Sequence, residues 1–294
     1  MSTTCCAVRS VRFGPRPWLA SDLAASTAWI VQAPPDLAAF SPDALRAWFA
    51  PHRQQLLHGY GVALIRGLTP QPQSMFRRLY LDLGLCLGIP DTTYGTLYDV
   101  TDRGHCHRSM AIPVSQTRAS TSMHTDSSRR ETHPRWVGLA CLQQAPVGGG
   151  SRLASALAVH DHLQAVDPAS LQRLKRCFYR DVVTPGAVDP MALIASNHFP
   201  VFSDAADGPS LRYMRFWIEK GHERLGLPLT DADCRAFDAL DAALNHSRFC
   251  HSFQLQEGDI LLMDNHKLVH DREAYNDNPR RPRHLIRLWL NEGG

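Results

Sequence analysis

The sequence has 294 residues, which is enough for one large domain or two small ones with a substantial core. Its 31 Lys and Arg residues nearly balance 28 Asp and Glu residues, so the formal net charge is only +3. This charge does not favour a nucleic acid or a membrane surface as a partner. The eight cysteines show no C-x-x-C spacing, which argues against a zinc knuckle and against a disulfide-stapled secreted fold.

The N-terminal segment shows no apolar stretch typical of a signal peptide, and the chain has no run of 18 apolar residues. We therefore expect a cytoplasmic protein with reduced thiols. The sequence contains no internal repeat and no low-complexity linker. We accordingly expect a single domain over residues 1–294, in which residues 1–35 form an irregular lead-in.

The first part of the chain mixes helical and strand patterns. Ser41 followed by Pro42 predicts a helix start, and Pro51 predicts a break within that helix. Residues 61–67 form an apolar run bounded by glycines, which is typical of a buried strand. Apolar residues at helical spacing over 73–86 predict a second helix.

The later part of the chain reads mostly as strands. Strands are expected at 136–145, at 151–156, in pieces within 178–218 that include LRYMRFWI, and in pieces from 248 to 291, whereas helices are expected from 159, with a break at Pro168, and from 230. Many short strands with helices at the front and in two later inserts predict a mainly β fold with α elements. The expected core is a β-sandwich or barrel flanked by helices.

His124 and Asp126 are the first candidate metal ligands. On an extended segment, side chains two residues apart point to the same face, so one metal ion could bind both. His270, far along the chain, is the candidate for a third ligand. Two histidines and one carboxylate on one face of a metal leave positions open, which is the arrangement of non-haem Fe(II) oxygenases. Because isolated H-x-D pairs are common, the surrounding spacings carry this interpretation.

Several spacings and contexts combine around these three residues. Ser151 follows the H-x-D motif after 24 intervening residues, and Arg283 follows His270 after 12. Arg287 lies four residues further, and the contexts VGLACLQ, GGGS, GDILLMDN and RHLIR accompany the motif. In these features the chain resembles the taurine dioxygenase-like Fe(II)/2-oxoglutarate oxygenases, which include the clavaminate synthase-like amino-acid hydroxylases. The resemblance covers about residues 40–290.

The resemblance implies a double-stranded β-helix (jelly-roll) core with flanking helices and helical inserts. It also implies Fe(II) as the metal, with 2-oxoglutarate and O2 as cosubstrates, and His124, Asp126 and His270 as the iron ligands. Arg283 is then expected to pair with the distal carboxylate of 2-oxoglutarate, since a planar guanidinium binds a carboxylate through two hydrogen bonds. Ser151 is expected to help hold the same cosubstrate.

Four further arginines are candidates at this site. Arg287 resembles the residue that meets the substrate's carboxylate in amino-acid hydroxylases of this family. Arg129 and Arg130 directly follow the metal motif, and they either lie on a solvated loop or form a lid that grips an anionic substrate. Arg281 is an alternative to Arg283 as the cosubstrate anchor, because its spacing also fits the pattern.

The resemblance implies decarboxylation of 2-oxoglutarate to succinate and CO2, coupled to hydroxylation of an unactivated C–H bond. The expected substrate is a small carboxylate-bearing molecule, such as an amino acid or a derivative from specialised metabolism, which a carrier protein could present. Asp126 disfavours halogenation, because related halogenases lack this carboxylate, and zinc hydrolysis would not require Arg283. Desaturation or cyclisation by the same chemistry, a non-catalytic metal- or small-molecule-binding protein on the same fold, and a homo-oligomer stay open.

Overall fold

The structure is a computed structural model that describes residues 14–104, 114–127, 129, 133–181 and 190–293. The larger of its two central sheets combines strands from both ends of the chain: β1 (Ile30–Gln32), β2 (Val62–Arg66), β3 (Gly88–Pro90), β4 (Tyr98–Val100), β5 (Trp136–Gln143), β13 (Ile260–Asp264) and β16 (His284–Glu292). The strand order is β1-β2-β13-β5-β16-β3, and β4 also pairs with β16. β1 and β2 run parallel, whereas β13, β5 and β16 pair antiparallel.

The smaller sheet carries one of the candidate metal ligands. It consists of β12 (Cys250–Phe253), β7 (Ser151–Ser155) and β14 (Leu268–Arg272), and both of its pairings are antiparallel. Leu153 and Leu268 of this sheet pack in one buried cluster with Leu261 and Leu285 of the larger sheet. The two sheets therefore face each other, which is the jelly-roll core that the sequence predicts.

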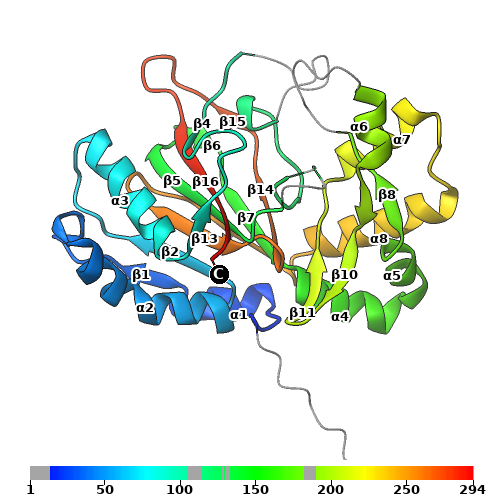
Figure 1. Ribbon diagram of the computed structural model, residues 1–294, viewed down its shortest axis with the longest axis horizontal. Coiled ribbons are helices and arrows are strands. Elements are labelled where there is room, and N and C mark those ends of the chain that lie inside the picture. The colour runs from blue at the N-terminus through cyan, green and yellow to red at the C-terminus, as the bar shows by residue number, and fades with distance from the viewer. Residues whose placement is uncertain (1–13, 105–113, 128, 130–132, 182–189, 294) are drawn as a thin grey trace, which may run out of the picture.

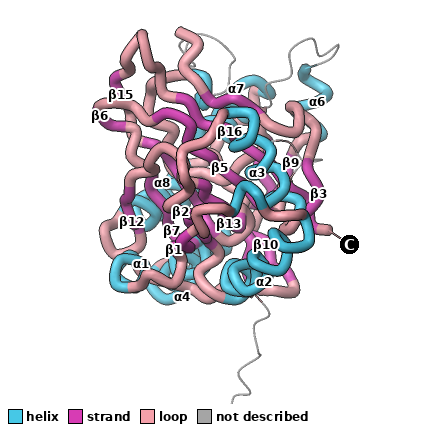
Figure 2. The backbone as a smooth tube through the Cα atoms, turned by 90° about the vertical axis from the view of Figure 1, so that its left-hand side faces the viewer, coloured by secondary structure: helices cyan, strands magenta, loops and turns pink. Residues whose placement is uncertain are grey.

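Helices cover the outer face of each sheet (Figure 1). On the larger sheet lie α2 (Pro42–His58) and α3 (Gln73–Leu85), and on the smaller sheet lie α4 (Ala156–Val166), α5 (Pro168–Leu174) and α8 (Asp231–Asn245). Figure 2 views the molecule from the side of α2 and α3, so these helices stand in front of the strands. Alternation along β13 explains the layers: Ile260 and Leu262 pack toward α2 and α3, whereas Leu261 and Met263 pack between the sheets.

The remaining elements lie at the edges of this core. They are α1 (Ala20–Ala25), the antiparallel pair β6 (Val147–Gly148) with β15 (Tyr275–Asn276), the pairs β8 (Cys177–Tyr179) with β9 (His198–Pro200) and β10 (Phe202–Ala205) with β11 (Gly208–Leu211), α6 (Pro190–Ser196), α7 (Arg215–Leu225), and two 3-10 turns, Leu37–Ala39 and Val114–Gln116. Within the described residues, every helix is too short or too polar to cross a lipid bilayer.

The lead-in predicted to be irregular over residues 1–35 contains α1 and β1, so that prediction was wrong for its described part. Two helix boundaries also differ from the sequence prediction. α2 begins as predicted, with the Ser41 hydroxyl accepting the Ala44 N–H, but Pro51 does not end it. Burial of Phe49 before the proline and of Leu56 after it explains this continuity, since tertiary packing offsets the one hydrogen bond that a proline removes. α4 begins at Ala156 rather than near 159, because the Ser155 hydroxyl caps its first turn.

The predicted strand over LRYMRFWI was wrong in its second half. Leu211 ends β11, but Arg215 begins α7. Trp217, Ile218 and Gly221 are buried along this helix, at the spacing of one helical face. The adjacent apolar residues Phe216, Trp217 and Ile218 fit a strand as well as a buried helix, so periodicity over so short a segment could not distinguish the two.

Candidate active site

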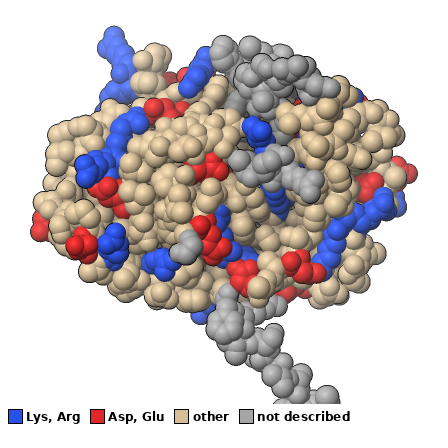
Figure 3. Space-filling view, viewed as in Figure 1, with Lys and Arg blue, Asp and Glu red and all other residues tan. Residues whose placement is uncertain are grey.

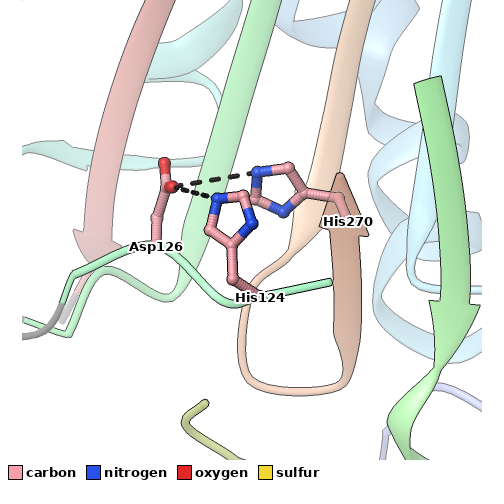
Figure 4. Close-up of side chains that lie close together, drawn as sticks. All are labelled: His124, Asp126 and His270. Atoms are coloured by element: carbon pink, nitrogen blue, oxygen red, sulfur yellow. Dashed lines mark ion pairs between the residues drawn. The ribbon is translucent and has the colours of Figure 1, made fainter. Parts of the chain in front are cut away.

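His124, Asp126 and His270 lie together beside the small sheet, with ligand atoms within 4.8 Å of one another. His270 is on β14, and His124 forms an isolated antiparallel bridge to it through N–H to carbonyl bonds of 3.0 and 2.9 Å. The Nε2 atoms of His124 and His270 lie 3.5 and 3.8 Å from Asp126 Oδ1 (Figure 4). Over the described part of the chain, this is the one group of three His, Cys, Asp or Glu residues with ligand atoms so close.

The backbone that carries Asp126 is less regular than the extended segment that the H-x-D spacing predicts. Ser122 and Ser127, on either side of the motif, have φ values of 56° and 70°, in the left-handed region that non-glycine residues rarely adopt. The Asn265 side chain holds this loop, since its Oδ1 accepts the Asp126 N–H at 2.7 Å and its Nδ2 donates to the Asp126 carbonyl at 3.2 Å. Neighbouring contacts therefore fix the carboxylate in place.

Thr125, between His124 and Asp126, connects this loop to the helical insert around Tyr213, between β11 and α7. The Thr125 N–H donates to the Tyr213 carbonyl at 2.8 Å, and the Tyr213 N–H donates to Thr125 Oγ1 at 3.0 Å. The buried Tyr213 hydroxyl in turn donates to Asp241 Oδ1 on α8 at 2.7 Å. The metal motif is thus bonded on one side to the sandwich and on the other to the insert.

A hydrogen bond at His124 and the pKa shifts of His270 and Asp126 suit a metal ion. His124 Nδ1 must donate to the Ser122 carbonyl, 2.8 Å away, because a carbonyl only accepts, and this leaves Nε2 with a free lone pair. Burial, with the neighbouring His124, lowers the pKa of His270 to about 3, so this imidazole stays neutral. Burial alone would raise the pKa of Asp126, but Arg287 and the histidines outweigh it and lower the pKa overall. An imidazole nitrogen with a free lone pair and an ionised carboxylate oxygen are donors that suit Fe(II).

The second oxygen of Asp126 is held by residues of β16. Trp289 Nε1 donates to Asp126 Oδ2 at 2.5 Å, and Arg287 Nη1 lies 3.7 Å from the same atom. The Arg287 guanidinium lies over the rings of Trp289 and Tyr98, at 4.2 and 4.9 Å from their centroids. Oδ1 therefore faces the histidines while Oδ2 is engaged by the indole. Sequence reasoning missed Trp289, although its place two residues after Arg287 puts both on one strand face.

Arg283 lies just before β16 and is 2% exposed. It lines the same cavity as the three candidate ligands. Its Nε donates to Gln144 Oε1 at 3.1 Å, whereas its buried Nη1 has no hydrogen-bond partner among the described residues. Gly149 has a φ of 71°, and a Cβ there would lie 3.2 Å from the Arg283 Nε, so glycine leaves the space that the guanidinium occupies. Arg281, the alternative anchor, points elsewhere: its side chain is 66% exposed and contacts Gln143 and Glu257.

The structure brings most of the predicted site residues to one cavity. Its walls include the three candidate ligands and Ser151, Arg283 and Arg287. Arg129 lies just beyond the metal motif, partly buried, with its N–H donating to Ser127 Oγ at 3.3 Å, and Arg130 lies outside the described residues. Figure 3 shows acidic and basic side chains interspersed over one face of the molecule, as the small net charge suggests.

Comparisons with known proteins agree with this geometry. Residues 22–289 match the family described as "Taurine catabolism dioxygenase TauD, TfdA family". FR-33289 synthase from Streptomyces rubellomurinus is 28% identical over 259 residues, which cover 81% of this chain and 71% of that protein. Uridine-5'-phosphate dioxygenase from a Streptomyces species is 30% identical over 186 residues, which cover 60% of this chain and 63% of that protein.

Solved structures share the fold at lower sequence identity. Asparagine oxygenase (AsnO) superposes with a TM-score of 0.67 at 18% identity, covering 90% of this chain and 94% of that one. The non-heme iron oxygenase OrfP, in complex with Fe and alpha-ketoglutaric acid, superposes with a TM-score of 0.62 at 17% identity, covering 87% and 82%. The match over residues 22–289 shows that the chain belongs to the TauD/TfdA family and is a dioxygenase that uses Fe(II), 2-oxoglutarate and O2.

Proposed function

We propose that this dioxygenase hydroxylates an unactivated C–H bond of a small molecule that carries a carboxylate or a similar anionic group. The observation that carries the proposal is one cavity whose walls hold a candidate metal-binding triad, a buried arginine with an open N–H group, and a second arginine on the same strand as the tryptophan that holds Asp126. When bound, the iron activates O2 while 2-oxoglutarate is converted to succinate and CO2.

We assign the roles at the metal from the donor atoms. His124 and His270 would bind Fe(II) through Nε2, and Asp126 through Oδ1, since these atoms converge and the opposite carboxylate oxygen is engaged by Trp289. Arg283 would bind the distal carboxylate of 2-oxoglutarate, because its buried Nη1 lacks a partner among the described residues and a carboxylate would supply one. Ser151, buried in the same wall, would add a hydroxyl.

Arg287 would meet the anionic group of the substrate. It lines the cavity next to the metal triad, and its guanidinium is oriented by two aromatic rings. Asparagine oxygenase was solved with 3-hydroxyasparagine and succinate, and OrfP with (3S)-hydroxy-L-arginine, so both neighbours hold hydroxylated amino acids. Uridine-5'-phosphate dioxygenase is named for a phosphate ester. These relatives support a small anionic substrate without choosing between a carboxylate and a phosphate.

We retain Arg129 and Arg130 as candidate lid residues over that substrate. Exchanging both for alanine should then raise the substrate KM much more than the 2-oxoglutarate KM. Unchanged values of both constants would contradict this role.

We also place the whole activity in one domain over residues 1–294, which the family match over 22–289 supports.

Desaturation or cyclisation is the second candidate reaction, because the same cavity and cofactors could support it. The mass of the product separates the two: hydroxylation adds one oxygen atom, whereas desaturation and ring closure remove two hydrogen atoms. A binding protein without activity on this fold is disfavoured, since the three ligands and Arg283 are all in place around one cavity.

The test is succinate formation by protein purified without air, supplied with Fe(II) and 2-oxoglutarate and then with O2. Wild-type protein should show slow turnover even without substrate, and Asp126→Ala and Arg283→Ala should abolish it. If the wild type forms no succinate and shows no metal-to-ligand absorption band with 2-oxoglutarate, the proposed function is wrong. A positive result would justify a screen of substrates, with free amino acids before carrier-bound ones.

A further inference from the structure

A second buried arginine, Arg272, lines the same cavity as Arg283. On β14 it follows His270 by two residues, so its side chain leaves the same face of the strand as the candidate ligand. Its register partner on β7 is Ser151, and residues directly opposite in an antiparallel ladder also share a face. Arg272, Ser151 and Arg283 all line the cavity.

The contacts of Arg272 fix its position without neutralising its charge. Its Nη2 donates to the carbonyls of Thr117, at 2.9 Å, and Ala119. Its backbone exchanges bonds with Thr121, whose Oγ1 accepts the Arg272 N–H at 2.8 Å and whose N–H donates to the Arg272 carbonyl at 3.1 Å. Its buried Nε has no hydrogen-bond partner, and no carboxylate forms an ion pair with it, among the residues that the structure describes.

Arg272 and Arg283 pack against the same tyrosine. Their guanidinium carbons lie 4.8 and 5.1 Å from the centroid of the Tyr275 ring. Two buried cations this close repel each other, and each keeps an unsatisfied N–H, Nε in Arg272 and Nη1 in Arg283. Both costs are removed if an anion with several acceptor oxygens enters the cavity beside them.

We propose that Arg272 is a positioning and specificity residue for the cosubstrate: together with Arg283 it selects a 2-oxo dicarboxylate over a 2-oxo monocarboxylate of equal length. Arg283 binds the distal carboxylate directly, and Arg272 adds a second positive charge from the neighbouring strand. Because Arg272 also holds the segment at Thr117–Thr121, it links occupation of the cosubstrate site to the loop that leads into His124. This inference rests on the proposed function, since it presupposes 2-oxoglutarate in this cavity.

The test compares two ligands on the same metal-loaded protein without O2. 2-Oxoglutarate and 2-oxopentanoate chelate a metal identically and differ only in the distal carboxylate, so their dissociation constants report on that group. The affinities are measured from the metal-to-ligand absorption band of the Fe(II) protein. In Arg272→Gln, which keeps a polar amide on a shorter side chain but has no charge, the Kd of 2-oxoglutarate should rise on the order of tenfold, while that of 2-oxopentanoate stays nearly constant.

The controls separate charge from structure. Arg272→Lys keeps the charge and should retain most of the preference for the dicarboxylate. Arg281→Met removes an exposed arginine outside the cavity and should change neither constant. An equal rise of both constants in Arg272→Gln would mean that the residue acts only through the loop, and no change in either would remove it from cosubstrate binding. Each of these results overturns the inference.

The same measurements distinguish a failure of the proposed function from a failure of the inference about Arg272. If wild-type protein gives no absorption band with any 2-oxo acid, the proposed function fails, and Arg272 is not the cause. If the wild type binds 2-oxoglutarate and Arg283→Met weakens that binding, but Arg272→Gln leaves the ratio of the two constants unchanged, only the inference about Arg272 fails.

Discussion

The arginines of the cavity fall into two groups that differ in how their charge is balanced. Arg287 already has a partner, because Asp126 Oδ2 lies 3.7 Å away and two aromatic rings cover its guanidinium. Arg272 and Arg283 share Tyr275 and form no ion pair among the described residues. An anion therefore gains more free energy beside the second group, where it satisfies open N–H groups, than beside the first, where it must compete with a carboxylate. The second group suits a cosubstrate common to every turnover, and the first suits a more readily exchanged substrate.

The largest effect is expected from Arg283→Met. Loss of the buried guanidinium should weaken binding of 2-oxoglutarate on the order of a hundredfold or more, because the distal carboxylate would lose a charge-assisted pair in a site shielded from water. Arg287→Met should leave that constant within severalfold of wild type and instead raise the substrate KM. Titration of the anaerobic Fe(II) protein measures the first constant. Equal losses of 2-oxoglutarate affinity in both variants would abolish the distinction between the two groups.

A smaller effect, on the metal rather than the cosubstrate, is expected from Trp289→Phe. The substitution keeps a ring under Arg287 but removes the N–H that donates to Asp126 Oδ2, so the carboxylate can rotate away from the histidines. Metal affinity should fall by about tenfold to a hundredfold, as for other residues that orient metal ligands. Calorimetric titration with Co(II) or Mn(II) checks this without turnover.

Trp217→Phe is the matched control for that measurement. Trp217 lines the same cavity but, within the described residues, forms no hydrogen bond with Asp126. Its metal affinity should equal that of the wild type. A similar loss of affinity in both tryptophan variants would show that the cavity lining, and not the indole N–H, sets how tightly the metal is held.

The smallest effect is expected from the histidine stack that adjoins Asn265. His266 stacks on His133 with centroids 3.9 Å apart, and burial, with the charge of Arg135, lowers its pKa to about 4. An unfolded histidine has a pKa of about 6.5, so between these values the unfolded chain binds a proton that the folded protein does not. Stability should therefore decrease as the pH falls from about 6.5 toward 4, by on the order of 1–2 kcal/mol at pH 5 for this one group.

His266→Gln provides the test. Glutamine does not titrate and can still donate to the His133 carbonyl, so the variant should lose less stability than the wild type between pH 7.5 and pH 5. Urea denaturation at the two pH values gives the difference. Parallel losses in both proteins would assign the acid sensitivity to other buried groups.

The sequence predicted those site residues that residue type and spacing along the chain are enough to indicate. Short strand patterns predicted a β-sandwich or barrel flanked by helices, and the family resemblance implied the jelly-roll core. The H-x-D motif, Ser151, Arg283 and Arg287 do lie around one cavity. Their roles at that cavity stay predictions until the variants are measured. Arg281 and Arg283 were not distinguishable by spacing, and burial separates them.

The contributions of other residues depend on pairing between distant strands, which no local pattern encodes. Asn265 reaches Asp126 across 139 residues of sequence, and Trp289 reaches it across 163. Arg272 stands opposite Ser151 only because β14 and β7 pair in one particular register. A shift of that register by one residue would turn Arg272 away from the cavity, so its position could be known only from the folded structure.

The double hydrogen bond between Thr125 and Tyr213 has a consequence for how such enzymes diversify. The insert that contains Tyr213 also supplies Met214 and Trp217 to the cavity wall, so sequence changes there can reshape the cavity while the segments that bear the three candidate metal ligands stay unchanged. The two segments are nevertheless joined at the residue between the ligands. A chimaera that exchanges the insert with one from a relative would inherit new selectivity only if its junction keeps a backbone segment able to exchange those two bonds.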